Sequence, residues 1–256
     1  MATNVAQFLC LTDNYGVLLH DSASGATASI DAPEAEPILA AARHHGWRLT
    51  DVLLTHHHAD HIQGVPRLKE SFPELRVCGP AKEASRIPFL DVLVGEGDFA
   101  SVGSLRAKVI ETPGHTLGHV AYHFEEDEIA FCGDTIFSLG CGRAFEAPYE
   151  VLWSSLMKLA RLPRETQLYC GHEYTEANGR FALTIEPHNP ALKGRIEEVA
   201  KLRAEGRPTL PTTVAAELAA NPFLRAEEPT IQAAVGMPGA DPAAVFAEIR
   251  SRKDRF

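Results

Sequence analysis

Long hydrophobic runs are missing from this 256-residue chain, and so is an excess of positive charge. No apolar stretch approaches the roughly 18 to 20 residues that cross a membrane. Lysine and arginine number 24 against 34 aspartates and glutamates, so the formal net charge is −10. Proteins that bind nucleic acids or anionic membranes need the opposite balance on their surface. We therefore expect neither nucleic acid nor a membrane among the partners.

Cysteine is scarce, and a secretory signal is not visible. An odd number of cysteines spread thinly through a mid-sized chain argues against a disulfide framework. The first eight residues lack the basic start and the apolar block of an export signal. These two observations predict a cytoplasmic protein with reduced cysteines. The five are Cys10, Cys78, Cys132, Cys141 and Cys170.

The composition is that of a folded protein, with 45% hydrophobic and 23% charged residues. Strand-like and helix-like segments alternate through the first two thirds of the chain, which predicts helices packed on sheets. We expect a mixed α/β domain over residues 1–174. The strands are expected at 17–19, 27–30, 51–54 and 167–170, with a hairpin at 120–132, and the helices at 36–45, 62–70 and 151–162.

Beyond residue 174 the strand signals nearly vanish. Helical patterns occupy residues 191–204, 214–219, 230–235 and 243–253, and prolines separate them as helix breakers would. Residues 175–256 are therefore expected to form a small all-helical domain.

Four of the twelve histidines fall within six positions, directly after an apolar strand. In extended chain His56 and His58 share a face, while His57 points away. Asp60 and His61 follow, where the chain turns toward a helix. Crowding such groups has a solvation cost unless a metal holds them, and their nitrogen and oxygen donors suit zinc and similar ions.

Three further donors each follow a strand-like run or lie in a glycine-containing turn: His115, Asp134 and His172. Sites in α/β architectures gather at strand ends. Seven donors are too many for one tetrahedral metal, whereas two metals that share Asp134 would use them all. His119 is expected to pack or to hydrogen-bond behind a ligand, and Cys132 and Cys170 to be buried in strands without binding metal.

The ordered set Thr55-His56-X-His58-X-Asp60-His61, Pro113-Gly114-His115, Gly133-Asp134 and Gly171-His172 resembles the signature of the metallo-β-lactamase superfamily. Longer matches at 131–137, 140–143, 168–175 and 250–254 resemble one family within it, glyoxalase II, the hydroxyacylglutathione hydrolases. This resemblance covers nearly the whole chain. It implies a four-layer αββα sandwich followed by the helical domain.

The resemblance also implies a site with two divalent metal ions, most often zinc, with iron or manganese as alternatives. Asp134 would bridge the ions, and a hydroxide held between them would be the nucleophile, so Asp60 and Asp134 count as catalytic. The implied ligands are His56, His58 and His115 for one ion and Asp60, His61 and His172 for the other.

The implied reaction is hydrolysis of the thioester of S-(2-hydroxyacyl)glutathione, typically S-D-lactoylglutathione, to glutathione and D-lactate. This is the second step of the glyoxalase pathway of methylglyoxal detoxification. The thiol that leaves has a pKa near 8.5, so a strong general acid is not required. The chain is expected to act as a monomer.

Cations for the substrate carboxylates are concentrated near the C-terminus. On a helix Arg250 and Lys253 share a face, and so do Arg252 and Arg255, so spacing alone leaves both pairs open. The resemblance selects Arg250 and Lys253. It adds three further substrate contacts, Arg143, Phe145 and Tyr174.

Two positions depart from the family pattern, and two other functions remain open. Phe145 stands where some relatives have an aromatic hydroxyl, and Ala147 replaces a frequent glycine. A mononuclear iron persulfide dioxygenase shares the fold, but the helical extension counts against it. A non-enzymatic metal-binding module would have no use for a domain that grips a substrate.

Overall fold

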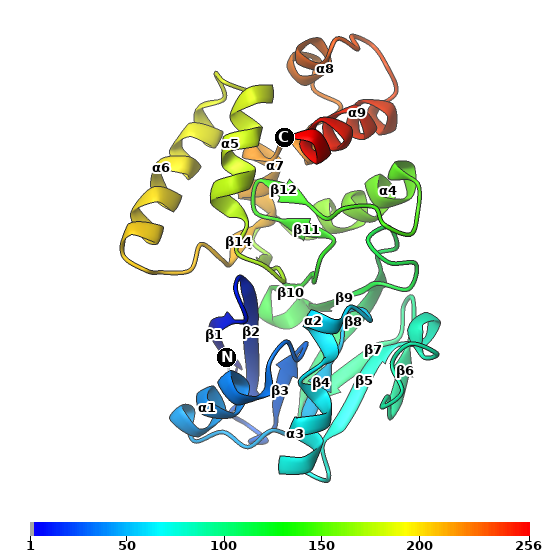
Figure 1. Ribbon diagram of the computed structural model, residues 1–256, viewed down its shortest axis with the longest axis vertical. Helices are drawn as coiled ribbons and strands as arrows, with labels where there is room; N and C mark the ends of the chain where they lie inside the picture. The colour runs from blue at the N-terminus through cyan, green and yellow to red at the C-terminus, as the bar shows by residue number, and fades with distance from the viewer. Residues whose placement is uncertain (1–2) are drawn as a thin grey trace. The chain divides into compact units, whose positions relative to one another are not determined.

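The computed structural model describes residues 3–256. Met1 and Ala2, which open the stretch where no export signal is expected, lie outside the described residues. The chain divides into two compact units (Figure 1). The first unit comprises the residues up to Glu111 together with Thr116–Gly133, and the second comprises Thr112–His115 and Asp134–Phe256. A domain boundary after residue 174 stays a prediction.

The first unit contains a six-stranded sheet in which the strands follow one another in chain order. Its first three strands are antiparallel, and its last four run parallel from β3 onward. The strands are β1 (Thr3–Cys10), β2 (Asn14–Asp21), β3 (Thr27–Ile30), β4 (Asp51–Leu53), β5 (Arg76–Pro80) and β6 (Val92–Val94). The strands expected at 17–19, 27–30 and 51–54 are confirmed.

Helices α1 (Ala35–His45) and α3 (Val65–Ser71) cover one face of this sheet (Figure 1). Their buried side chains form a core with those of the central strands: Leu18, Ile38, Leu39, Val52, Leu68 and Val77. Most of the helix expected at 62–70 is confirmed as α3, but its expected start is wrong, because a short helix α2 (Ala59–Ile62) ends before α3 begins at Val65. Pro66 in the first turn of α3 lacks the amide hydrogen that a continuous helix needs.

A second sheet in the first unit carries the expected hairpin. Tyr122 reaches across from it and donates its hydroxyl to the Leu54 carbonyl at 2.7 Å, which joins the two sheets. The antiparallel strands are β7 (Phe99–Val102), β8 (Leu105–Glu111), β9 (Val120–Phe124) and β10 (Ile129–Phe131).

Asp21, at the end of β2, joins the first sheet to the turn between β7 and β8 of the second. Its carboxylate accepts hydrogen bonds from the Ser24 hydroxyl at 2.5 Å and from both the backbone amide and the hydroxyl of Ser104 at 2.7 Å. The Ser24 bond, followed by those from Ser104 and the amide of Ala23, outweighs the opposing effect of burial and holds the pKa of this carboxyl well below its usual range.

The second unit combines one short hairpin, a second pair of short strands and several helices (Figure 1). Strand β11 (Ile136–Phe137) pairs with β12 (Gly140–Cys141), and β13 (Gln167–Tyr169) pairs with β14 (Thr212–Thr213). The helices are α4 (Tyr149–Ala160), α5 (Thr175–Ile185), α6 (Pro190–Ala204), α7 (Val214–Ala220), α8 (Pro229–Val235) and α9 (Pro242–Arg255).

The helices expected beyond residue 190 are confirmed to within two residues, and so is the one at 151–162. Three of them begin with a proline in the first turn, where its missing amide hydrogen costs nothing. Helix α5 was not expected from the sequence. It contains Gly179, where a Cβ would lie 3.1 Å from Ile196 of α6, so this glycine allows the two helices to pack closely.

All five cysteines are buried, and within residues 3–256 none forms a disulfide. None of the helices in this part of the chain combines the length and apolar character of a membrane span.

Candidate metal centre

The loop between β4 and α2 brings the first group of candidate ligands together. His56 is fully buried, and its Nε2 lies 3.1 Å from Nδ1 of His58. The ring of His61, on α2, lies 4.1 Å from that of His56, measured between centroids. His57 points away and places its Nδ1 2.9 Å from Glu83. The alternation expected for this segment is therefore confirmed.

Asp31, which sequence analysis missed, lies behind this group. Its carboxylate accepts a hydrogen bond from Nδ1 of His61 at 2.7 Å, and others from the amide and the hydroxyl of Thr55 at 2.7 and 2.8 Å. Nδ1 of His56 lies 3.0 Å from the same Thr55 hydroxyl. Because the Nδ1 hydrogens are engaged in this way, Nε2 of His56 and of His61 carries the lone pair with which each could bind a metal ion.

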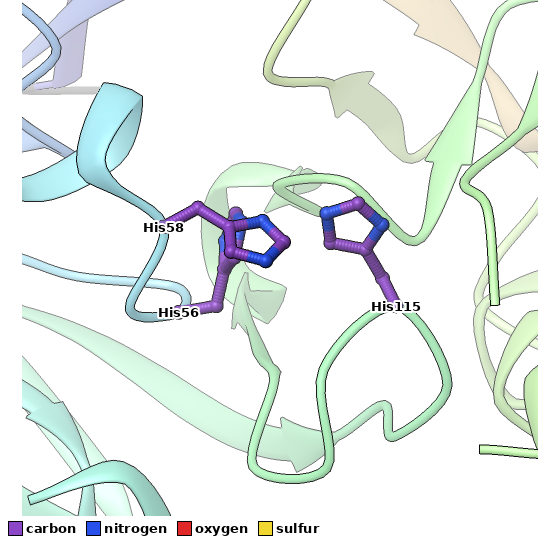
Figure 2. Close-up of side chains that lie close together, drawn as sticks. All are labelled: His56, His58 and His115. Atoms are coloured by element: carbon purple, nitrogen blue, oxygen red, sulfur yellow. The ribbon is translucent and has the colours of Figure 1, made fainter. Parts of the chain in front are cut away.

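The second unit brings together the three other candidate ligands. Nε2 of His115 lies 3.5 Å and Nε2 of His172 3.3 Å from the same Asp134 oxygen, Oδ2. All three side chains are buried. Nδ1 of His115 donates to the Arg143 carbonyl at 3.0 Å, which again leaves the lone pair on Nε2. Figure 2 shows this imidazole on the loop after β8, and those of His56 and His58 on the loop after β4.

The donors in both groups fit a divalent metal. They are imidazoles and carboxylates, a nitrogen and oxygen set that suits zinc, iron or manganese. In the first unit, ligand atoms of Asp31, His56 and His61 lie within 4.8 Å of one another. Asn14 donates a hydrogen bond to the Asp60 carboxylate at 3.1 Å, which fixes the position of that candidate metal ligand.

The neighbouring residues lie as the sequence predicts. His119 is fully buried and stacks on His56, with 4.8 Å between ring centroids. Gly133 is required beneath it, because a Cβ there would lie 2.6 Å from Nε2 of His119. Cys132 and Cys170 are buried strand-end residues.

The hairpin formed by β11 and β12 follows Asp134 directly and is connected by hydrogen bonds to α7 and its C-terminal end. The buried carboxylate of Glu217 accepts hydrogen bonds from the Leu139 amide at 2.8 Å and from the Thr212 hydroxyl at 2.7 Å. Asn221 donates to Glu217 and to the carbonyls of Phe137 and Gly140. Burial raises the pKa of Glu217, against these hydrogen bonds.

The structure distinguishes the two pairs of cations on α9. Arg252 donates to the Val235 carbonyl at the end of α8, at 2.7 Å, and Arg255 to Ser251. Arg250 is instead buried and donates to the Cys141 carbonyl of the hairpin, at 3.0 Å. Lys253 donates to the Ala177 carbonyl of α5, at 3.2 Å. The pair selected by the resemblance thus faces the hairpin and α5.

Lys253 lies in a positive environment. Burial, with repulsion from Arg250, Arg180 and Arg143, lowers the pKa of its ammonium group to about 8. Arg180 was not among the expected substrate contacts. No local signal in the sequence marks it, because helix α5, on which it lies, was itself not expected.

The two expected aromatic contacts lie beside candidate ligands of their own unit. Tyr174 stacks on His172, with 4.8 Å between centroids and 5° between ring planes. Phe145, 59% exposed, lies 5.1 Å from the His115 ring. Both can therefore contact a ligand held near these imidazoles.

Two family models match the chain and together cover residues 11–256. The model for the metallo-beta-lactamase superfamily matches residues 11–172, and the model described as hydroxyacylglutathione hydrolase C-terminus matches residues 173–256. Among similar curated proteins, a hydroxyacylglutathione hydrolase of Rhodopseudomonas palustris (strain BisA53) is 55% identical and one of Nitrobacter winogradskyi 54%. In each case the match covers all of both chains.

Solved structures share the fold. ETHE1 from Myxococcus xanthus is 31% identical, with a TM-score of 0.61 over 84% of this chain and 98% of that one. The BLEG-1 B3 metallo-beta-lactamase, at 22% identity, has a TM-score of 0.65 over 86% and 99%. The fold and family expected from the sequence are confirmed. This chain belongs to the metallo-β-lactamase superfamily and, within it, to the hydroxyacylglutathione hydrolase family.

Proposed function

We propose that this chain hydrolyses the thioester of S-(2-hydroxyacyl)glutathione, S-D-lactoylglutathione in particular, to glutathione and a 2-hydroxy acid such as D-lactate. This is the second step of methylglyoxal detoxification. One observation carries the proposal: relatives named for this activity match from end to end at about 55% identity. The match thus includes both the segments with the candidate ligands and the C-terminal cations.

The proposed centre holds two divalent ions, zinc in first place. The buried Asp134 carboxylate supports its assignment as the bridge, because the imidazoles of His115 and His172 flank one of its oxygens. When bound, such ions bring the pKa of water from about 15.7 to near 7 and polarise a carbonyl. The proposed ligands are His56, His58 and His115 for one ion, and Asp60, His61 and His172 for the other.

The side chains of the protein orient these groups. Asp31 and Thr55 fix the tautomers of His61 and His56, and the Arg143 carbonyl fixes that of His115. Neutral imidazoles held in this way need no rearrangement before they bind metal. The glutathione thiolate is a good leaving group, so no protein acid is assigned to protonate it.

The substrate carboxylates are proposed to bind at the cations of the second unit. Arg143, Arg250 and Lys253 offer charged donors, and the bonds of Arg250 to the hairpin and, at 3.0 Å, to Asp254 also hold this region in place. Phe145 and Tyr174 supply ring surfaces. Phe145 does so without a hydroxyl. We assign this activity to a monomer in the cytoplasm, in line with the reduced cysteines.

The test is release of free thiol from S-D-lactoylglutathione by the purified protein, before and after removal of metal with a chelator. We expect activity that the chelator abolishes and zinc restores, with about two ions bound per chain. Oxygen uptake with glutathione persulfide and one iron per chain would support a dioxygenase instead. Bound metal without thiol release would leave only a metal-binding module.

A further inference from the structure

Glu83 is a buried carboxylate that contacts two loops next to candidate ligands. It is the last residue of a short 3-10 helix (Ala81–Glu83) after β5, and only 3% of it is exposed. Its Oε2 lies 2.9 Å from Nδ1 of His57. Its Oε1 accepts hydrogen bonds from the Thr116 hydroxyl and from the Gly118 amide, the latter at 3.1 Å.

The direction of these hydrogen bonds follows from Arg86. A guanidinium only donates, and NH1 of Arg86 lies 2.9 Å from Nε2 of His57. Nε2 therefore accepts, and Nδ1 carries the hydrogen that His57 donates to Glu83. The guanidinium of Arg86 is thus connected through the imidazole of His57 to the buried carboxylate of Glu83, which needs such a partner.

Both loops carry candidate ligands directly beside these contacts. His57 lies between His56 and His58 in the chain, and Thr116 follows His115. The contact on the second loop is close, because a Cβ at position 118 would lie 2.4 Å from Cγ of Glu83. One carboxylate therefore fixes the backbone next to three of the seven proposed ligands.

We propose that Glu83 is a positioning residue for the metal centre: through His57 and Thr116 it holds the loops on which His56, His58 and His115 lie. In this role it acts through the loops and not as one of the seven proposed ligands. The inference rests on the proposed metal centre and is independent of the substrate. The alternation of side chains along the extended segment gave His57 no role, and this hydrogen-bond network gives it one.

The test is the substitution Glu83→Gln. Glutamine keeps the size of the side chain and an acceptor for Thr116 and Gly118, but it turns an NH2 group toward Nδ1–H of His57, so two donors face each other. We expect zinc affinity, measured by competition with a chromogenic chelator, to fall about tenfold, the low end for groups behind the ligands. The visible spectrum of the cobalt-loaded protein should change as well.

Thr116→Val tests the other arm, since it removes one hydroxyl from a buried site with almost no change of shape. It also serves if Glu83→Gln does not fold, and the same two readouts should shift in the same direction. The matched control is Glu186→Gln. Glu186 is also buried and pairs with Arg225 at 3.0 and 3.1 Å, but it contacts neither loop.

The control should lose thermal stability and keep the zinc affinity and cobalt spectrum of the wild type. The inference is overturned if folded Glu83→Gln or Thr116→Val binds zinc as the wild type does, or if Glu186→Gln weakens binding as much. The zinc and cobalt measurements use no substrate, so they test this inference separately from the proposed function. If the wild type releases no thiol but Glu83→Gln still binds zinc tenfold more weakly, the proposed function fails and the role of Glu83 stands.

Discussion

The two units hold their imidazoles in different ways. In the first unit, His61 donates to the carboxylate of Asp31, whereas in the second, His115 donates to the backbone carbonyl of Arg143. A carboxylate partner makes an imidazole more basic, and a single substitution can remove it. A carbonyl is neutral and moves only when the chain moves. Metal affinity in the first group therefore depends on a side chain, and in the second on the path of the backbone.

The largest effect is expected from Asp31→Asn. This change removes the charge behind His61, and its NH2 group would face one of the three hydrogen-bond donors, which are Nδ1 of His61 and the amide and hydroxyl of Thr55. Metal affinity should fall about 10- to 100-fold. The measurement is metal content by elemental analysis after dialysis against a chelator of graded concentration. Asp51→Asn is the control, because Asp51 is as buried and pairs with Arg76 without touching a candidate ligand. Equal metal content in Asp31→Asn and Asp51→Asn would remove the distinction between the two units.

The corresponding change in the second unit is Gly142→Ala. A Cβ there would lie 2.0 Å from the Asp134 carbonyl oxygen, so the hairpin must shift. Overpacking of this kind costs about 1 to 3 kcal/mol, and we expect kcat/KM for thioester hydrolysis to fall at least tenfold. Gly194→Ala, on α6 with open space around it, should leave kcat/KM unchanged. A Gly142→Ala protein with full activity would show that backbone position does not limit the second group.

Lys253→Met should separate substrate binding from stability. We expect KM to rise severalfold with little change in kcat, because a uniform binding contact is lost. In the wild type, KM should also rise as pH increases through about 8, where Lys253 loses its charge. Lys201→Met, exposed on α6, is the control.

Although Lys253→Met should weaken substrate binding, the same variant should have a more stable fold at pH 7. The pKa of Lys253 is lowered to about 8 in the folded protein from an ordinary value of 10.5. The unfolded chain therefore binds more protons between these values, and the free energy of unfolding rises with pH across this window. Lys253→Met should raise Tm at pH 7 and abolish that rise. A lower Tm at pH 7 would contradict the burial of this charge.

The smallest effects concern two structural carboxyls with opposite shifts. Asp21 has a lowered pKa, so it stabilises the fold above the pKa of the unfolded chain, and this contribution is lost as pH falls through its folded pKa. Asp21→Asn should cost about 1 kcal/mol at pH 7. Glu217 has a raised pKa, so its charged form opposes folding, and stability falls as pH rises through its titration.

Glu217→Gln should therefore remove that fall and leave stability at pH 7 almost unchanged, because the Thr212 hydroxyl can accept from the new NH2 group while the other donors keep their acceptor. Urea denaturation at pH 4, 5 and 7 measures both variants. If Glu217→Gln lost more unfolding free energy at pH 7 than Asp21→Asn, the opposite effects assigned to these two carboxyls would be contradicted.

Features with a local signal were predictable from the sequence. The parity of His56, His57 and His58 follows from the strand that precedes them, and the later helices follow from their apolar spacing and their prolines. Helix α5 was missed because Gly179 disfavours a helix until α6 packs against it. The break before α3 was missed because the apolar pattern continues across it.

Residues that act through distant contacts could not be predicted. Asp31 lies 30 positions before His61, and Glu83 lies 33 positions before Thr116. An isolated acid in a sequence does not indicate which loop it holds. The candidate ligands could be named from the sequence because several lie within one short segment, whereas their supports depend on how separate segments fold together.

The buried cysteines have a chemical consequence under the proposed function. Each turnover would release glutathione, which cells also contain as a disulfide that exchanges with protein thiolates. Burial raises the pKa of Cys10 to about 12 and of Cys78 and Cys141 to about 11, so at pH 7 about one in ten thousand of these groups, or fewer, is ionised. These three thiols would thus react only very slowly with the oxidised form of the enzyme's own product.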